Sequence, residues 1–281
     1  MKYRFTKMHG ISNDYIYFNC FEQDIPDPAA LSVRMSPRHS SVGADGIVLI
    51  CPSDCADARM RMFNADGSEG RMCGNAIRCV GKYLYDNRMV QKKHLRIETL
   101  SGIRDLLLHV QGDRVRSVTV DMGVADFSPA AVPLAADSPF MDRPVMVLDR
   151  EWNITALSVG NPHAVCFVED VDALDLERIG PYFENHPLFP ERVNTEFVQL
   201  LPDGALKMRV YERGSGETWA CGTGACAAVA AAARNRLVGF GRPVDVHLIG
   251  GVLSILCDTD YRIQMTGPAQ KVYEGVYDDE D

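Results

Sequence analysis

The amino-acid sequence contains two copies of one pattern, separated by 148 residues. The first copy, MRMFNADGSEGRMCGN, begins at Met60, and the second copy, MRVYERGSGETWACGT, begins at Met208. The Cys73-Gly74 pair of the first copy aligns without a gap with the Cys221-Gly222 pair of the second. A repeat of this length indicates that the chain folds as two similar halves.

The repeat extends beyond these two segments. The same offset places Asn13, in HGISNDYIYF, on Asn161, in SVGNPHAVCF. The stretches that begin at Ser41 and at Arg192 also resemble each other, and we expect a slightly different spacing there. Between the halves, residues 123–144 carry four prolines among small residues, which is typical of a connector. We therefore predict domain boundaries near residues 122 and 123.

Composition excludes several classes of function. The chain has 281 residues, of which 46% are hydrophobic and 24% are charged, the balance of a folded protein. Its formal net charge of −9 disfavours both a nucleic-acid partner and an anionic membrane surface. No apolar run is long enough to span a bilayer, and the first ten residues do not read as a secretion signal. We expect a cytoplasmic protein.

Local patterns predict the same succession of elements in both halves. Residues 59–64 and 207–212 alternate as strands do, and a glycine-rich turn follows each. Each Cys-Gly pair then opens a helical run, at 74–87 and 222–237, and the second run is rich in alanine. A short helix is expected over 175–185, and further strands over 94–100, 116–123, 144–149 and 154–160. The fold class is α+β, with a β-rich shell around one principal helix in each half.

A cysteine at a helix N-terminus can serve two purposes. The helix dipole lowers the pKa of a thiol there, and the unpaired N–H groups can hold an anion. If the two halves face each other, a carboxylate substrate would have one sulfur on either side. One thiolate could then remove the proton from the carbon beside the carboxylate, and the opposite thiol could return one to the other face. This chemistry requires no cofactor and no metal.

The other candidate residues have simpler interpretations. A buried cysteine usually acts as a small hydrophobic residue, and we expect this of six cysteines: Cys20, Cys51, Cys79, Cys166, Cys226 and Cys257. Cys55 lies in a polar stretch and is expected to be exposed. A zinc site is disfavoured because no CxxC pair occurs, and CGTGACA lacks the pattern of a phosphate-binding loop. The residues alone leave open whether His163 is structural or functional.

Six segments together resemble the motifs of the diaminopimelate epimerase family: MHGISND, SVGADG, FNADGSEGRMCGNAIRC, GNPH, ERVNTEF and YERGSGETWACGTGA. The resemblance implies two pseudo-symmetric domains, each a β-barrel-like sheet around a central helix. It also implies that residues 267–281 return to the first domain, so that residues 123–266 form the second. The implied reaction is the cofactor-independent interconversion of LL- and meso-2,6-diaminopimelate, on the route to lysine and peptidoglycan. The implied assembly is a homodimer.

The resemblance also implies roles for individual residues. Cys73 and Cys221 would be the acid–base pair, with His163 and Glu212 orienting or polarising the thiols. The reacting carboxylate would bind to backbone amides at Gly74, Asn75, Gly222 and Thr223. The distal amino-acid end of the substrate would bind to Asn13, Asn64, Asn161, Asn194 and Arg213. Three places depart from the usual family sequence, namely Ile11-Ser12, Gly46 and Trp219.

Other functions share parts of this pattern. A proline racemase or hydroxyproline epimerase uses the same two thiols on a smaller substrate. An isomerase of the phenazine-biosynthesis type would lack the cysteine pair. A non-enzymatic anion-binding protein could use the two helix starts without catalysis. The combination of Asn64, Asn194 and Arg213 favours the longer diamino-diacid substrate.

Overall fold

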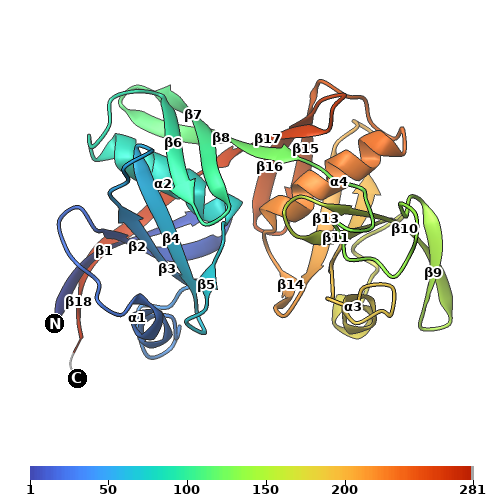
Figure 1. The fold of residues 1–281 in the computed structure, drawn as a ribbon, viewed down its shortest axis with the longest axis horizontal. Helices are drawn as coiled ribbons and strands as arrows, with labels where there is room; N and C mark the ends of the chain where they lie inside the picture. Colours follow the sequence, from blue (N-terminus) through green and yellow to red (C-terminus); the bar gives the residue numbers. More distant parts are fainter. Residues whose placement is uncertain (280–281) are drawn as a thin grey trace. The chain divides into compact units, whose positions relative to one another are not determined.

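The structure is a computed structural model that describes residues 1–279. The chain divides into two compact units, drawn in Figure 1. Unit 1 comprises residues 1–120 together with the segment from Thr266 onward, and unit 2 comprises residues 121–265. The chain passes between the units within two strands, β8 (Arg114–Val124) and β17 (Arg262–Pro268). Residues 280 and 281, the end of the segment 267–281 that was predicted to return to the first domain, lie outside the described residues.

Unit 1 is a mixed sheet with two helices. The sheet pairs in the order β18-β1-β2-β3-β4-β6-β7-β8, in which the pairs β2–β3 and β4–β6 are parallel and the others are antiparallel. The elements not yet delimited are β1 (Lys2–Gly10), β2 (Asn13–Asn19), α1 (Pro28–Met35), β3 (Gly46–Cys51), β4 (Ala58–Asn64), β5 (Glu69–Gly70), α2 (Gly74–Asp86), β6 (His94–Thr99), β7 (Gly102–Gln111) and β18 (Gln270–Asp278).

Unit 2 repeats this plan. Its strands pair in the order β9-β10-β11-β12-β13-β15-β16, and the parallel pairs are β11–β12 and β13–β15. Its elements are β9 (Arg143–Val147), β10 (Arg150–Ser158), β11 (Pro162–Phe167), α3 (Leu176–Glu184), β12 (Asn194–Leu200), β13 (Leu206–Glu212), β14 (Gly216–Thr218), α4 (Gly222–Arg234), β15 (Pro243–Leu248) and β16 (Gly251–Cys257). The α+β class with two similar halves is therefore confirmed.

The register of the strands corrects one expectation about the repeat. Ile16 pairs with Ile47 in unit 1, and Ala164 pairs with Thr195 in unit 2. Each residue of the second pair follows its counterpart in the first pair by the same 148 positions. The spacing therefore does not change at β3 and β12, contrary to the sequence comparison. The side chains there have diverged, whereas the backbone pairing has been kept.

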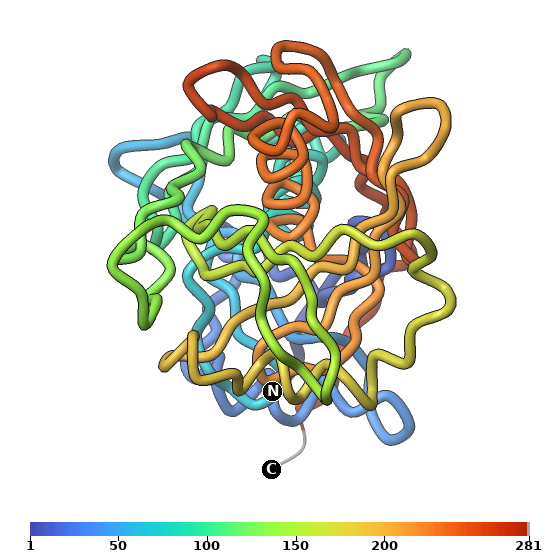
Figure 2. The backbone as a smooth tube through the Cα atoms, turned by 90° about the vertical axis from the view of Figure 1, so that its right-hand side faces the viewer, coloured from blue at the N-terminus to red at the C-terminus, as the bar shows by residue number. Residues whose placement is uncertain are grey.

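One helix in each unit is almost entirely buried. α4 consists mostly of alanine, and its residues from Gly224 to Ala233 are buried against β10–β13, β15 and β16. Figure 2 shows α4 in orange, with strands of its own unit around it. α2 packs against β1, β2 and β7. The small side chains of α4 let its backbone approach the sheet closely, so the start of this helix is held firmly in place.

Helix α1 was not among the elements predicted from the sequence. Asp27 accepts a hydrogen bond from the Ala30 amide at 3.0 Å, and Pro28 occupies the first position of the helix. An aspartate cap followed by proline is a usual start signal, but only eight residues follow it. The buried residues Leu31 and Met35 attach the helix to the core of unit 1.

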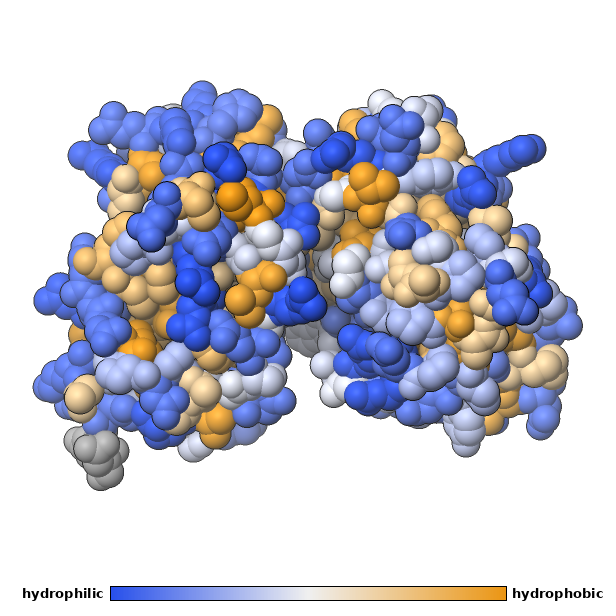
Figure 3. All heavy atoms as spheres, viewed as in Figure 1, coloured by the Kyte–Doolittle hydropathy of each residue, from blue (hydrophilic) through white to orange (hydrophobic). Residues whose placement is uncertain are grey.

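The surfaces that Figure 3 displays are largely hydrophilic, with apolar side chains scattered among the polar ones. Within residues 1–279, no helix combines the length and the apolar character that crossing a membrane requires.

Candidate active site

Cys73 caps the first turn of α2. Its backbone is extended, with φ −132° and ψ 119°, and the Ala76 amide donates a hydrogen bond to its Sγ at 3.5 Å. The thiol in turn donates to Asn13 Oδ1 at 3.4 Å. The sulfur is half-buried, so a small molecule could reach it. The structure thus places the predicted catalytic thiol of unit 1 at a helix N-terminus, with a predicted substrate-binding residue beside it.

A network of charges holds Asn13 in position. Its Nδ2 donates to Asp45 Oδ2 at 2.7 Å, and Arg38 bridges Asp45 to Asp14. Burial raises the pKa of Asp45, and the neighbouring charge of Asp14 adds to this effect. Burial also acts to raise the pKa of Asp14, but hydrogen bonds from Arg38 and Lys7 outweigh it and leave that pKa lowered. Asn13 is the only residue of this network that was predicted, because the ion pairs around it form only in the folded chain.

The first turn of α2 is fixed by a buried arginine. Arg78 is fully buried, and its guanidinium donates to the Gly74 carbonyl at 3.0 Å and to Asn75 Oδ1 at 2.9 Å. Its Nε also donates to the Pro268 carbonyl at 3.2 Å, within the same unit. These bonds hold Gly74 and Asn75, whose amides were predicted to bind the substrate. Asn64 lies at the end of β4, where its side chain donates to Ser68 Oγ at 3.0 Å.

Cys221 occupies the equivalent position in unit 2, but it is buried. It caps α4 with φ −109° and ψ 105°, and the Gly224 amide donates to its Sγ at 3.3 Å. Thr223 Oγ1 lies 3.5 Å from the sulfur and accepts a hydrogen bond from Asn161 Nδ2 at 3.3 Å. The structure therefore brings three of the predicted residues together at the start of α4.

His163 lies behind this group and is fully buried. Its Nε2 is 3.0 Å from Asn161 Oδ1, and its Nδ1 is 2.7 Å from Oε1 of Glu196. The imidazole is thus held between Asn161 and Glu196, next to the Cys221 group.

Glu196 is a residue that the sequence analysis did not single out. It is fully buried in β12, and its Oε2 has no hydrogen-bond partner within residues 1–279. Burial raises its pKa, while His163 acts in the opposite direction. Its position, 33 residues after His163, corresponds to Val48 in unit 1 at the 148-residue offset. The strand pattern gives no sign of a buried carboxylate, because a charged residue in a strand usually faces solvent.

The pKa of Cys221 corrects the expectation from the helix dipole. Burial raises the pKa of this thiol well above its usual value, and the nearby charges of Glu212 and Glu196 raise it further. The hydrogen bonds from Thr223 and the Gly224 amide oppose these effects without cancelling them. The Cys221 sulfur therefore carries its proton at neutral pH, because desolvation outweighs the helix terminus.

Three further predicted residues lie near the end of β13. Thr218 donates a short hydrogen bond to Glu212 Oε1. Asn194 donates from Nδ2 to the Pro162 carbonyl at 2.9 Å and accepts from the Arg213 amide at 2.9 Å. The guanidinium of Arg213 is exposed, and it donates to the Glu191 carbonyl at 3.0 Å. Asn194 thus links β11 to the turn that carries Arg213.

Comparison with known proteins identifies the family. The family model described as diaminopimelate epimerase matches residues 5–128 and 155–272. A curated protein named diaminopimelate epimerase, from Acetivibrio thermocellus, is 51% identical over 277 residues, which are 98% of each chain. This chain belongs to the diaminopimelate epimerase family.

Solved structures with low identity share the fold of the family. A hydroxyproline epimerase from Agrobacterium vitis aligns with a TM-score of 0.72 and 17% identity, over 98% of this chain and 92% of that one. A phenazine-biosynthesis protein of the PhzF family, from Bacillus anthracis, aligns with a TM-score of 0.73 and 18% identity, over 99% of both chains. These similarities support the two-unit α+β architecture.

The departures from the usual family sequence have visible consequences. Ile11 and Ser12 both have positive φ, 49° and 70°, in the turn between β1 and β2, a backbone conformation that favours glycine. Gly46 has φ +152°, and a Cβ built on it would lie 2.0 Å from the Phe63 carbonyl oxygen. A side chain at position 46 would therefore force the backbone of this family member to move. Trp219 is 62% exposed.

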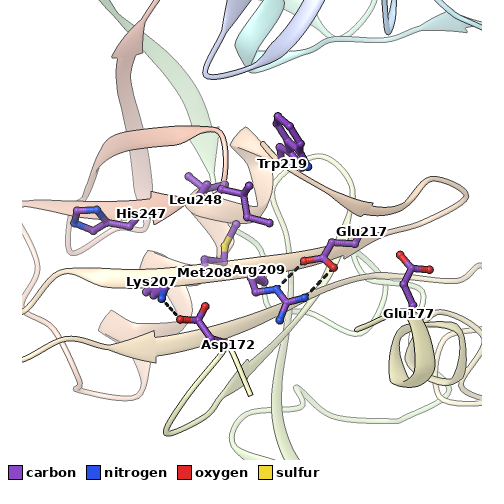
Figure 4. A pocket seen from close by; sticks show the side chains of 10 residues that line it. Asp172, Glu177, Lys207, Met208, Arg209, Glu217, Trp219, His247 and Leu248 are labelled. Carbon is purple, nitrogen blue, oxygen red and sulfur yellow. Dashed lines mark hydrogen bonds and ion pairs between the residues drawn. The ribbon is translucent and has the colours of Figure 1, made fainter. Parts of the chain in front are cut away.

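Trp219 lines a groove of about 480 Å³ on unit 2, but the groove does not contain Cys221. Its charged side chains satisfy one another: Arg209 donates to both oxygens of Glu217, at 2.7 and 2.9 Å, and Lys207 pairs with Asp172 (Figure 4). The Arg209–Glu217 pair repeats the Arg61–Glu69 pair of unit 1 at the 148-residue offset of the repeat. We interpret these pairs as supports for β5 and β14. Within residues 1–279, no three His, Cys, Asp or Glu side chains gather as a metal site requires.

The close packing around Gly224 gives a testable prediction. A Cβ at this position would lie 2.7 Å from Glu196 Oε1 and 3.2 Å from Cys221 Sγ. We expect Gly224→Ala to displace both groups and to lower kcat about a hundredfold, with a smaller change in KM, because small displacements of reacting groups are costly. Steady-state kinetics measure the effect.

The matched control lies on the other helix. Unit 1 carries Ala76 at the position equivalent to Gly224 and Val48 at the position equivalent to Glu196. Ala76→Gly adds no atom beside Cys73, so we expect it to change kcat less than tenfold. A Gly224→Ala variant with unchanged kcat would show that Glu196 and Cys221 are not held as closely as described.

Proposed function

We propose that this chain interconverts LL- and meso-2,6-diaminopimelate. The observation that carries the proposal is the 51% identity, over 98% of both chains, with a curated protein named diaminopimelate epimerase. The geometry of each unit supports it. Cys73 and Cys221 cap equivalent helices at equivalent positions of the repeat, as a reaction with one thiol on each face of a carbon would require.

In the proposed mechanism the two thiols exchange roles with the direction of the reaction. One thiolate removes the α-proton, and the opposite thiol donates a proton to the other face of the carbon. The raised pKa of Cys221 favours its role as proton donor in the resting protein. Backbone amides at Gly74, Asn75, Gly222 and Thr223 would bind the reacting carboxylate. They stabilise the transition state, because negative charge accumulates on that group as the proton leaves.

The remaining predicted residues would support or orient these groups. His163 would hold Asn161 and Thr223 against Cys221, and its contact with Glu196 would keep the imidazole oriented. Glu212, anchored by Thr218, would assist the thiol through its charge. Asn13, Asn64, Asn194 and Arg213 would bind the distal end of the substrate, where the guanidinium of Arg213 suits a carboxylate. The reaction would use no cofactor.

The substrate is tested by direct assay. We expect the purified protein to epimerise LL-diaminopimelate to the meso isomer and to leave L-proline and trans-4-hydroxy-L-proline unchanged, as followed by chiral chromatography. The alternative is an enzyme of the proline racemase or hydroxyproline epimerase type. Turnover of proline or hydroxyproline, together with none of diaminopimelate, would replace the proposal with that alternative.

The proposal extends to the setting of the protein. We infer a cytoplasmic enzyme, because catalysis by two thiols requires a compartment that keeps them reduced. We also infer a homodimer that acts on a small molecule and has no nucleic-acid or membrane partner. Light scattering coupled to size-exclusion chromatography tests the dimer, and a mass near 31.1 kDa, that of one chain, would refute it.

A further inference from the structure

A second pair of cysteines lies in unit 1, apart from the predicted catalytic thiols. Cys20 follows the last residue of β2, and Cys51 is the last residue of β3. These strands are parallel, with Asn19 opposite Ile50, and the Cys20 amide donates to the Ile50 carbonyl at 2.9 Å. The next position along each strand is a cysteine, so Cys20 and Cys51 lie opposite each other across the strand pair. β2 and β3 can be followed side by side in Figure 1.

The position of the pair permits a disulfide. Neighbouring strands are about 4.8 Å apart, and disulfides form between Cα atoms separated by roughly 4.4–6.8 Å, so the backbone need not move. Both thiols are half-buried, at the edge of the core. The expectation that these two residues act only as small hydrophobic side chains is therefore incomplete, because small reagents can reach them.

The charges around the pair make the two sulfurs unequal. Arg59 of β4 is the cross-strand partner of Cys51, and Arg61 lies two residues further along the same strand. The hydrogen bond from the Cys20 thiol lowers the pKa of Cys51, and the charges of Arg61 and Arg59 add to this effect against the opposing effect of burial. The same hydrogen bond, together with burial, raises the pKa of Cys20. Because Arg59 lies directly across from Cys51, we assign Cys51 as the nucleophile of the pair and Cys20 as the thiol that attacks it after oxidation.

We propose that Cys20 and Cys51 form a reversible disulfide on exposure to a peroxide. The Cys51 sulfur attacks one oxygen of hydrogen peroxide, the O–O bond breaks, and the hydroxide that leaves takes up a proton to form water. The Cys20 sulfur then attacks the resulting sulfenic acid and displaces its oxygen as a second water, which carries the Cys20 proton. In total, two thiols and one peroxide give one disulfide and two waters. A small dithiol reverses the reaction.

The link would join β2 to β3 at the ends of the strands. Asn13 and Asp45, which hold Cys73, lie at the opposite ends, because the strands are parallel. The disulfide would close a loop that contains α1, so we expect the oxidised protein to melt at a higher temperature than the reduced one. The site is thus separate from the groups of the proposed epimerase reaction, and it does not depend on that function.

The experiment uses the full-length chain in a Cys73→Ala, Cys221→Ala double variant, so that neither of those thiols contributes. The reduced protein is treated with a few equivalents of hydrogen peroxide, alkylated, digested and analysed by mass spectrometry. We expect a Cys20–Cys51 linked peptide about 2 Da lighter than its two thiol peptides combined, which disappears after dithiothreitol treatment. We also expect Cys51 to react at least about tenfold faster than the exposed Cys55.

Two further variants separate the roles of the thiols. In Cys20→Ser, Cys51 should still react but should accumulate as sulfenic and sulfinic acid, because no partner remains. In Cys51→Ser, Cys20 should remain largely reduced. The proposal would be overturned if no linked peptide formed and both Cys20 and Cys51 were fully alkylated after peroxide treatment. It would also be overturned if Cys55 reacted with peroxide faster than Cys51.

Discussion

Replacing either Cys73 or Cys221 with alanine is expected to reduce epimerisation of diaminopimelate by at least about a thousandfold. Each sulfur caps its own helix and would serve one face of the substrate carbon, so neither can substitute for the other. Steady-state rates in both directions measure the loss. Circular dichroism checks that both variants fold, since each loses only one small side chain.

The matched control for Cys221 lies on the same helix. Cys226 is buried in α4, one turn further along, and we expect it to be structural. Cys226→Ala should therefore keep the rate within about threefold of the parent, because the removed sulfur only packs. A Cys73 or Cys221 variant with a rate close to that of the Cys226 variant would show that one thiol is sufficient, and the two-thiol mechanism would fail.

The second large effect concerns stability rather than turnover. Lys7 is 6% exposed, and its Nζ lies 2.6 Å from Asp14 Oδ2. Asp14→Asn would leave a buried ammonium group without its carboxylate, which costs about 3–5 kcal/mol of unfolding free energy. Urea unfolding at neutral pH measures the loss. The control is Asp278→Asn, whose partner Lys2 is mostly exposed, and there we expect about 0–1 kcal/mol.

The pH dependence of this effect has a defined sign. The pKa of Asp14 is lowered in the folded protein, so its stabilising contribution is fully present above the ordinary aspartate pKa of 3.8. This stabilising contribution is lost as the pH falls below the ordinary aspartate pKa and then past the lower pKa that Asp14 has in the folded protein. The parent and Asp14→Asn proteins should therefore converge in stability on acidification. A difference that stays constant from neutral pH down to acid would contradict the ion pair.

Much of the fold could be predicted because the controlling signals are local and repeated. The Cys-Gly pairs mark the starts of α2 and α4, and the alternating residues before them mark β4 and β13. The helix expected over 175–185 is α3, with Asp175 and Asn185 as its two caps. Helix α1 was missed although Asp27-Pro28 is a start signal, because so short a helix has no clear apolar periodicity.

The candidate site could be predicted only where a motif names the residue. Arg38 pairs with Asp45, Asp45 accepts a hydrogen bond from Asn13, and Asn13 accepts one from Cys73. The segments that carry these residues are distant in sequence, so no local pattern connects them. Glu196 lies in a strand between Thr195 and Phe197, and only the pairing of β11 with β12 places it against His163. The helix terminus suggested a lowered pKa for Cys221, whereas the effect of burial appears only once the chain is folded. Contacts between strands, rather than local sequence, therefore decide these properties.

The most direct test of the central claim follows the proton. LL-diaminopimelate is converted in deuterium oxide, and both isomers are recovered early and analysed by mass spectrometry and NMR. Two thiols on opposite faces predict that the first meso product carries deuterium at the inverted carbon, while the recovered LL substrate carries none. Deuterium that appears equally in both isomers from the first time point would require one shared base, and it would contradict the assignment of Cys73 and Cys221 to opposite faces.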